Sequence, residues 1–220
     1  MSGGLDTYNG SCIVGMLGNK CAAIGADCRF GTQFQTMSTN SQKVYKIQDN
    51  ILMGLSGLHT DCQAFSLIMR RKVELYRIRE ETDLTPKLFA SLISTTLYEK
   101  RFSPYFVSPV VVGLDVTDDY KPFVCGFDSI GCPSSSGQFE ISGTCTDQLL
   151  GTCEAFYKDN MSEEELFQAV GQSVVCSTER DILSGYGANI YVLTPGKITV
   201  SSLKTRQDWF NSISNKYNLL

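Results

Sequence analysis

The chain has 220 residues, of which 42% are hydrophobic and 19% charged, with a formal net charge of −4. This composition is typical of a globular protein with an ordinary core and excludes an intrinsically disordered chain. The charge balance lacks the excess of basic residues that is typical of a nucleic-acid-binding surface. No apolar run approaches the roughly 18 residues that a membrane span needs. We therefore expect neither a nucleic-acid partner nor a membrane.

The cysteine content favours an intracellular protein. There are nine cysteines, an odd number without a CxxC pair, and the single histidine, His59, leaves few ligands for zinc. We interpret the cysteines as reduced, mostly buried, small apolar residues, and the alternative is a metal or disulfide framework. Residues 1–9 are polar and glycine-rich, unlike a secretory signal peptide.

The first third of the chain predicts two pairs of strands. Residues 11–17 and 21–26 are apolar runs around the turn signal Gly18-Asn19-Lys20. Residues 44–47 and 51–55 flank a second turn-like stretch. Each pair is expected to form a hairpin.

Two helices are expected next. Residues 60–81 carry an amphipathic pattern that predicts a helix with one apolar face. Thr85-Pro86 is typical of an N-cap followed by proline at the first helical position, and a second amphipathic helix extends from there to about Leu97. The face predicted for the first helix consists of Ala64, Leu67, Ile68 and Leu75, interrupted by Lys72.

The second half of the chain repeats this order. Strands are predicted at residues 105–114, 122–128 and 139–142, the first containing a valine run typical of a strand buried on both faces. Helices follow at 147–157 and from the capping box Ser162-x-x-Glu165 to about residue 180. Residues 188–193 and 198–203 form a closing hairpin.

The order of strands, two helices, strands, two helices and strands predicts an α+β fold. We expect a four-layer α/β/β/α sandwich, in which two antiparallel sheets pack face to face and a helix pair flanks each. A doubly wound parallel sheet is the main alternative, weakened because the helices come in pairs. No linker divides the chain, so we expect one domain over residues 1–220, with a short N-terminal extension (1–10) and a C-terminal tail (205–220).

Several polar residues fall where the core pattern does not explain them. Asp27 closes a predicted strand, Lys43 opens another, and Asp181 and Ser184 follow a long helix. Ser-Gly pairs end two further strands, where glycine lets a backbone approach a ligand closely. Taken singly, each has an ordinary reading as a turn residue, a helix end or a solvated charge.

Together these residues resemble a known family, the β-type subunits of the proteasome core particle, which are N-terminal-nucleophile hydrolases. Residues 25–29 (GADCR) are similar to the family's Asp-Ser-Arg turn, and Lys43-Val44 to its catalytic-lysine strand. Residues 55–61 (LSGLHTD) resemble its substrate-binding strand end, and 180–185 (RDILSG) its most specific signature. The resemblance extends from about residue 8 to 204.

Other stretches resemble one structural class of β subunit that is not counted among the peptidases; they are residues 98–106, 128–132 and 142–148. This resemblance implies the N-terminal-nucleophile hydrolase fold and a place in a seven-membered β ring that contacts an adjoining α ring. The complex it implies is a threonine-type endopeptidase that degrades ubiquitin-tagged and unfolded proteins in cytoplasm and nucleus. It implies no cofactor.

Ser11 is the decisive position. In active members, self-cleavage after a glycine frees an N-terminal threonine, whose hydroxyl is the nucleophile and whose own amine is the base. The family's spacing of sixteen residues to the turn aspartate and thirty-two to the lysine places Ser11, after Gly10, at the nucleophile. The structural class is expected to carry glycine there, so this serine departs from the pattern.

The remaining family site positions are also filled here, with Thr144 in place of the usual serine. An active N-terminal-serine peptidase, using Ser11 after cleavage at Gly10, is therefore the alternative function. The residues that match the family site are Ser11, Asp27, Lys43, Gly57, Thr144, Asp181 and Ser184.

We nevertheless expect a non-catalytic subunit in which these positions are vestigial. The chain begins at Met1, so we expect the nitrogen of Ser11 to remain an amide without a basic lone pair. Asp27, Lys43 and Asp181 then form a structural ion-pair network. An unrelated globular binding domain is a third reading, which leaves the matching spacings at Ser11 as coincidence.

Two questions stay open at this level. The sequence does not decide whether an ion binds near Asp181 and Ser184. It also leaves open whether the tail, with Trp209 and Phe210, docks on a neighbouring subunit or folds back onto its own domain.

Overall fold

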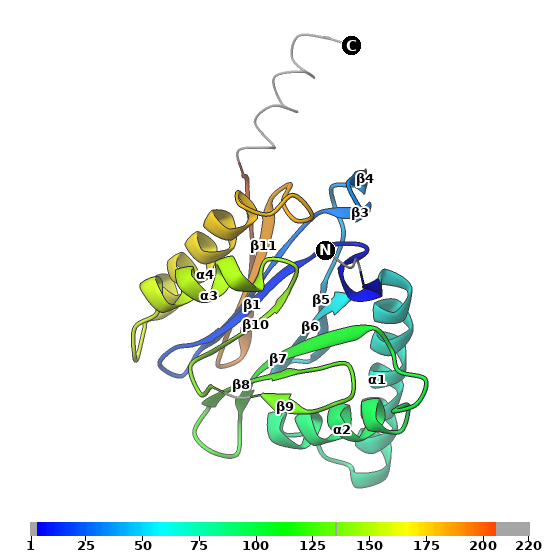
Figure 1. Cartoon of the computed structure of the whole chain (residues 1–220). Coiled ribbons are helices and arrows are strands. Elements are labelled where there is room, and N and C mark those ends of the chain that lie inside the picture. The colour runs from blue at the N-terminus through cyan, green and yellow to red at the C-terminus, as the bar shows by residue number, and fades with distance from the viewer. Residues whose placement is uncertain (1–3, 135, 206–220) are drawn as a thin grey trace.

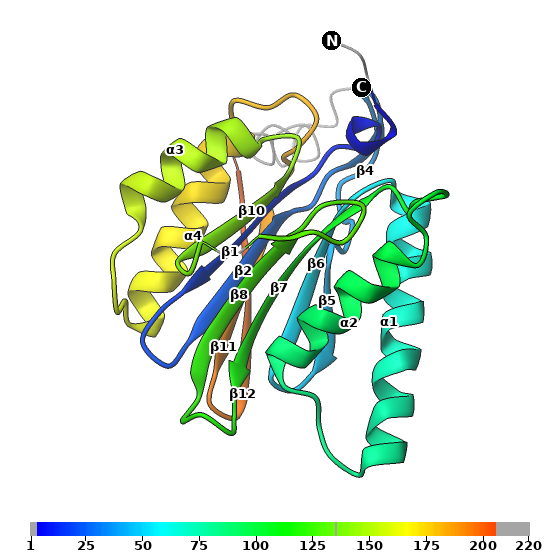
Figure 2. The same ribbon diagram turned by 60° about the horizontal axis from the view of Figure 1, so that its bottom comes forward.

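The computed structural model of the chain describes residues 4–134 and 136–205. Two five-stranded sheets face each other, with one helix pair covering the outside of each (Figure 2). This is the expected four-layer sandwich. The C-terminal tail beyond residue 205, with Trp209 and Phe210, lies outside the described residues, so its predicted docking is not tested.

The first sheet joins the two ends of the described chain. Its strand order is β10-β1-β2-β11-β12, and each neighbouring pair is antiparallel. Strands from the first and last parts of the chain therefore lie side by side at its centre (Figure 1). The strands are β1 (Cys12–Leu17), β2 (Ala22–Asp27), β10 (Phe139–Gly143), β11 (Ala188–Thr194) and β12 (Lys197–Leu203).

The second sheet follows chain order as a meander, β5-β6-β7-β8-β9, again with antiparallel pairs only. Because every described pairing is antiparallel, the doubly wound parallel alternative is wrong. The strands are β5 (Val44–Gln48), β6 (Ile51–Gly57), β7 (Val107–Asp115), β8 (Lys121–Phe127) and β9 (Pro133–Ser134).

The described residues form four α-helices, which are α1 (His59–Glu80), α2 (Pro86–Tyr98), α3 (Thr146–Phe156) and α4 (Glu163–Thr178). Both predicted start signals are confirmed. The Thr85 hydroxyl accepts a hydrogen bond from the backbone of Leu88, and Ser162 and Glu165 form a reciprocal capping box. Each cap satisfies backbone N–H groups that have no partner inside the helix.

The apolar face predicted for α1 is wrong. Leu67 and Leu75 are 49% and 52% exposed, whereas the helix buries Cys62, Phe65, Ser66, Met69 and Val73. The buried stripe contains a serine and a cysteine, and strong apolar residues lie outside it, so hydrophobicity alone selected the wrong side. Packing against β5 and β6 decides the orientation of this helix instead.

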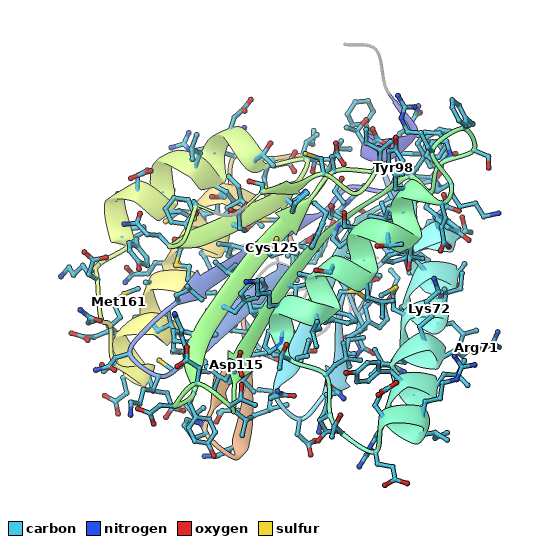
Figure 3. The ribbon with its side chains drawn as sticks, turned by 90° about the horizontal axis from the view of Figure 1, so that it is seen from below. Arg71, Lys72, Tyr98, Asp115, Cys125 and Met161 are labelled. Atoms are coloured by element: carbon cyan, nitrogen blue, oxygen red, sulfur yellow. The ribbon has the colours of Figure 1, made fainter. Side chains whose placement is uncertain are left out.

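The space between the two sheets is filled by short branched side chains. Val110 and Val112 of β7 meet Ile13 and Ile24 of the other sheet in this middle layer, and all four are fully buried. Val111 points to the opposite face of β7, into the core beneath α1 and α2. The valine run is thus buried on both faces, as predicted. Figure 3 labels Cys125, which belongs to β8.

Four small elements were not predicted, and one of them is the two-residue strand β9 at the edge of the second sheet. Strands β3 (Phe30–Thr32) and β4 (Gln35–Ser38) form a two-stranded sheet, and a single 3-10 turn, η1 (Leu5–Thr7), precedes β1. They are short and largely exposed, so their sequences carry no hydrophobic periodicity. All nine cysteines lie in the described part, where no disulfide joins any two of them and seven are buried, which confirms their predicted burial. No helix among the described residues is long and apolar enough to cross a membrane.

Candidate functional site

A buried ion pair lies where the ends of β2 and β5 approach each other. The ammonium nitrogen of Lys43 is 2.6 Å from Oδ1 of Asp27, and the two side chains are 8% and 0% exposed. Nζ of Lys43 also donates to the carbonyl oxygen of Gly10, at 3.1 Å. The lysine therefore connects the turn aspartate to the peptide bond that precedes Ser11.

The carboxylate of Asp27 is saturated with donors. Oδ1 also accepts the backbone N–H of Cys12 at 2.8 Å, and Oδ2 accepts those of Arg29 at 3.2 Å and Gly185 at 3.1 Å. Charge-assisted bonds of this kind offset the cost of removing the carboxylate from water. Asp27 therefore ties together β1, its own turn and the loop before β11.

Ser11 lies immediately before β1 and is held through its backbone. Its carbonyl oxygen accepts the N–H of Thr144 at 2.8 Å, and its own N–H donates to Oγ1 of Thr144 at 3.4 Å. The Thr144 hydroxyl lies 2.6 Å from Oδ2 of Asp181, to which it donates. The Ser11 hydroxyl oxygen is buried and has no hydrogen-bond partner among the described residues.

The last two family positions complete the surroundings. Gly57 ends β6 with a φ of +114°, where a Cβ atom would lie 2.2 Å from the carbonyl oxygen of Phe106. Only glycine fits there. Ser184 is 1% exposed beside Gly185, and its hydroxyl makes no hydrogen bond within the described residues.

The structure thus brings the predicted site residues into one region. Asp27 and Lys43 form its ion pair, and Ser11 is connected to Thr144 through its backbone. The expectation that Asp181 joins this ion pair is wrong for the described residues, because its carboxylate accepts the Thr144 hydroxyl instead. Gly57 lines the same small cavity as Ser11. Ser184 is joined to the other site residues through the next residue in the chain, Gly185, whose backbone N–H donates to the carboxylate of Asp27.

A short cover lies over this region. The side chain of Asn9 donates to the carbonyl oxygen of Gly31 on β3 at 2.8 Å, and its Oδ1 accepts the first N–H of α1, that of His59, at 2.9 Å. Gly10 follows with a φ of +74°, in a position where a Cβ atom would lie 2.0 Å from the carbonyl oxygen of Leu183. Asn9 thereby spans the opening between the small sheet and α1.

Little space remains beneath the cover. Ser11, Lys43 and Gly57 share a cavity of about 10 Å³ with Asn9 and Gly10. A volume of this size holds one water molecule and no peptide. With the cover in place, the Ser11 hydroxyl is therefore shielded from any peptide substrate.

The surroundings shift the pKa of two neighbouring groups. Partial burial lowers the pKa of His59, with a smaller contribution from the Lys43 charge, so its imidazole is neutral at pH 7. Its ring packs against Phe30 in a tilted arrangement, with centroids 4.4 Å apart. Burial chiefly raises the pKa of the Cys12 thiol, assisted by Cys145, so Cys12 stays protonated and unreactive.

Sequence reasoning missed two residues that hold the site together. Asn9 is one, and a polar residue before a glycine gives no sign of such a role. Arg29 is the other; it was noted only as part of the family turn, yet it is 1% exposed. Its guanidinium donates to carbonyl oxygens of Leu183 and Gln33, at 2.8 and 2.9 Å, and to the Thr36 hydroxyl at 3.0 Å. A buried arginine needs such acceptors, but the sequence does not reveal which ones.

Within residues 4–134 and 136–205, no three His, Cys, Asp or Glu side chains gather so that they could hold a metal ion.

Comparisons with known proteins give the family. A family model described as "Proteasome subunit" matches residues 7–193. The chain is 48% identical to "Proteasome subunit beta type-3-A" of Arabidopsis thaliana over 203 residues, covering 91% of this chain and 98% of the relative. At the same coverage it is 46% identical to "Probable proteasome subunit beta type-3" of Schizosaccharomyces pombe and 44% identical to "Proteasome subunit beta type-3" of Drosophila melanogaster.

These names confirm the expected resemblance to one structural class, which is the third β-type class of the eukaryotic complex. The segments that pointed to this class were residues 98–106, 128–132 and 142–148. Both the family match and the relatives' coverage extend over most of the chain. The chain therefore belongs to the proteasome subunit family.

Proposed function

We propose that the chain is a non-catalytic, structural subunit of the β ring of the 20S proteasome core particle. One observation carries the absence of catalysis. Asn9 bridges Gly31 and His59 above Ser11, and the cavity left beneath it holds about one water molecule. The relatives compared above, which bear the name beta type-3, support the subunit assignment.

The chemistry of the covered serine supports the same conclusion. An N-terminal nucleophile uses its own free amine as the base. In the continuous chain the nitrogen of Ser11 is an amide that donates a hydrogen bond to Thr144. Its lone pair is delocalised into the peptide bond, and no other described group accepts the hydroxyl proton.

Asp27 and Lys43 then have a structural function. Their ion pair, with the three backbone donors on Asp27, joins strands of both sheets and the loop before β11. Such a buried network is costly to break one member at a time, because removing one member leaves the other uncompensated. The ion pair and its hydrogen bonds thus hold the fold together without being used for hydrolysis.

The subunit completes a seven-membered β ring and contacts an adjoining α ring, walling the chamber of a threonine-type endopeptidase. Other β subunits supply the peptidase sites that degrade ubiquitin-tagged and unfolded proteins. Its partners are thus other proteasome subunits, without nucleic acid, membrane or cofactor, and it resides in cytoplasm and nucleus. The family match, together with the resemblance of the segments around Ser11, supports this placement.

Two measurements on purified core particles test the proposal. The intact mass of this chain should include residues up to Gly10, apart from loss or acetylation of Met1. An epoxyketone probe, which reacts with both a nucleophile hydroxyl and its free α-amine, should label other β subunits and leave this chain unlabelled.

A chain that starts at Ser11, or one that carries the probe, would contradict the non-catalytic assignment. Ser11 would then be the nucleophile, Lys43 the group that lowers its pKa, and Asp27 the residue that orients the lysine. Absence of the chain from purified particles would contradict the subunit assignment itself.

A further inference from the structure

The connection between α2 and β7 carries the most exposed aromatic side chain of the described residues. Phe102 is 98% exposed, and Tyr98, at the last position of α2, is 65% exposed. Figures 1 and 2 show this connection at the outer edge of the molecule, and Figure 3 labels Tyr98 where α2 ends. Full exposure of a phenylalanine is unfavourable in a free monomer and typical of a surface that becomes covered.

The tip of this connection is ordered by its own backbone. The backbone N–H groups of Lys100, Arg101 and Ser103 donate to carbonyl oxygens three residues earlier, at 3.0 Å each. A side chain presented by such a turn loses little conformational freedom when a partner covers it.

The base of the connection is fixed to the body of the protein. The ring of Tyr105 packs against Phe65 of α1, with centroids 5.8 Å apart. The backbone N–H of Phe106 donates to Oδ2 of Asp61 at 2.9 Å. The tip therefore projects from a rigid support.

The charge of the tip is opposite to that of the chain. The chain has a net charge of −4, yet Lys100 and Arg101 are adjacent here, and neither makes an ion pair within the described residues. The neighbouring Glu99 is engaged by Lys72 at 3.5 Å. The Arg101 guanidinium lies 5.8 Å from the centroid of the Phe102 ring, so the cation and the aromatic face form one unit.

From these features we propose that residues 98–102 form a docking projection that inserts Phe102 into an apolar pocket, edged by carboxylates, on another core-particle subunit. This inference rests on the proposed function. An aromatic ring beside an arginine is the residue combination found at energetic centres of interfaces, and the two free cations select an acidic rim. The projection also lies within residues 98–106, a stretch that resembles the third β-type class. Such a class-specific stretch can select one particular neighbouring subunit.

Site-specific photo-cross-linking in assembled particles provides a direct test. A photoreactive benzoyl-phenylalanine replaces Phe102, the particles are irradiated, and the cross-linked peptides are sequenced by mass spectrometry. We expect a cross-link to one other subunit, at a peptide that combines apolar residues with Asp or Glu. Particles that contain the chain but yield no cross-link to another subunit would overturn the docking proposal and leave the proposed function intact.

Competition for incorporation provides the second test. Arg101→Glu and Phe102→Ala, each co-expressed with an untagged wild-type copy, should enter particles about tenfold less well than a tagged wild-type chain. Arg71→Glu on the exposed side of α1 and Phe34→Ala at the 76% exposed tip of the β3–β4 turn are the matched controls. Equal losses in variants and controls would overturn the proposal.

An anionic membrane is a different partner for a cationic aromatic tip. Flotation of the tagged chain with vesicles of phosphatidylserine and phosphatidylcholine separates the two cases. Binding that disappears in Phe102→Ala, without a cross-link to a subunit, would overturn subunit docking. If even the wild-type chain is missing from particles, the proposed function fails and this inference with it.

Discussion

The ion pair of Asp27 and Lys43 is buried more completely than any other ion pair among the described residues. Exposed pairs contribute little because water and salt screen them. A buried pair is different, because either partner left alone is a desolvated charge without compensation. The energetic effect of the Asp27–Lys43 pair should therefore appear when one of its two side chains is removed.

Lys43→Ala should lower the free energy of unfolding by about 3–5 kcal/mol, because it strands the carboxylate of Asp27. The measurement is the fraction of tagged chain recovered in assembled particles, compared with Lys46→Ala. Lys46 pairs with Asp49 at the surface, so its removal should have no comparable effect. Normal assembly of Lys43→Ala combined with loss of one class of peptide cleavage would show that the site is catalytic.

The cysteines allow a second test at this scale. Burial raises the pKa values of Cys62 and Cys153 to about 12, while Cys132 and Cys176 are exposed. Since the thiolate is the reactive form, native chain treated with iodoacetamide should be alkylated at Cys132 and Cys176 only. Mass spectrometry of tryptic peptides gives the sites.

Cys62 and Cys153 should stay protected at both pH 7 and pH 9, because burial raises the pKa of each thiol to about 12 and keeps it protonated. Denatured chain, in which all nine cysteines react, is the control. Rapid native alkylation of Cys153 would mean that α3 does not cover it as described.

Among the elements, α4 offers a clean test of its start signal. Ser162→Ala removes the side-chain acceptor for the N–H of Glu165 and should cost about 1 kcal/mol of stability. Faster hydrogen exchange confined to the first turn of α4 is the expected readout. Ser91→Ala, at an exposed interior position of α2, is the matched control and should be neutral.

The stabilisation that this capping box gives to α4 should depend on pH. Hydrogen bonds from the backbone N–H and hydroxyl of Ser162 lower the pKa of the Glu165 carboxyl. A lowered folded-state pKa means that the stabilisation is present above the unfolded-state pKa and is lost as pH falls through the folded value. The difference in exchange between Ser162→Ala and wild type should accordingly shrink in acid.

Structural features that depend only on residues close together in the chain could be predicted from the sequence. The caps at Thr85 and Ser162 depend on neighbouring residues, and the valine run of β7 on its own composition. The orientation of α1 could not be predicted, because its buried stripe includes Ser66 while Leu67 and Leu75 face outward. Only the surface presented by β5 and β6 decides between the two sides.

The site shows the same division. Spacings within a family motif place Ser11, Asp27 and Lys43, and the structure brings them together. The bridge made by Asn9 could not be foreseen, because it joins a small exposed sheet to the start of α1. Neither of these partners is marked by a sequence pattern near Asn9.

At the scale of the whole molecule, the outer side of α1 and α2 remains apolar in several places. Leu67, Leu75, Ile78 and Leu88 are each about half exposed or more. We therefore expect the chain to be stable mainly as an assembled subunit. Expressed alone and analysed by size-exclusion chromatography, it should associate or aggregate.

A soluble monomer with a single cooperative unfolding transition would contradict this expectation and count against the ring assignment. Co-expression with other β subunits is the control, since partners that cover these surfaces should restore a defined complex.

The hydrogen bond from Gly185 to Asp27 spans 158 positions of the chain, and β2 cannot complete its pairing until β11 is available. Ribosomes add roughly 5–20 residues per second, so the N-terminal strands wait about 8–30 s for their late partners. Until then Asp27 lacks its hydrogen bond from Gly185, in a nascent chain whose first sheet is incomplete. Chaperones would therefore encounter the nascent chain while its N-terminal hairpins are still without their late partner strands. The closed arrangement around Ser11 would be among the last parts of the fold to form.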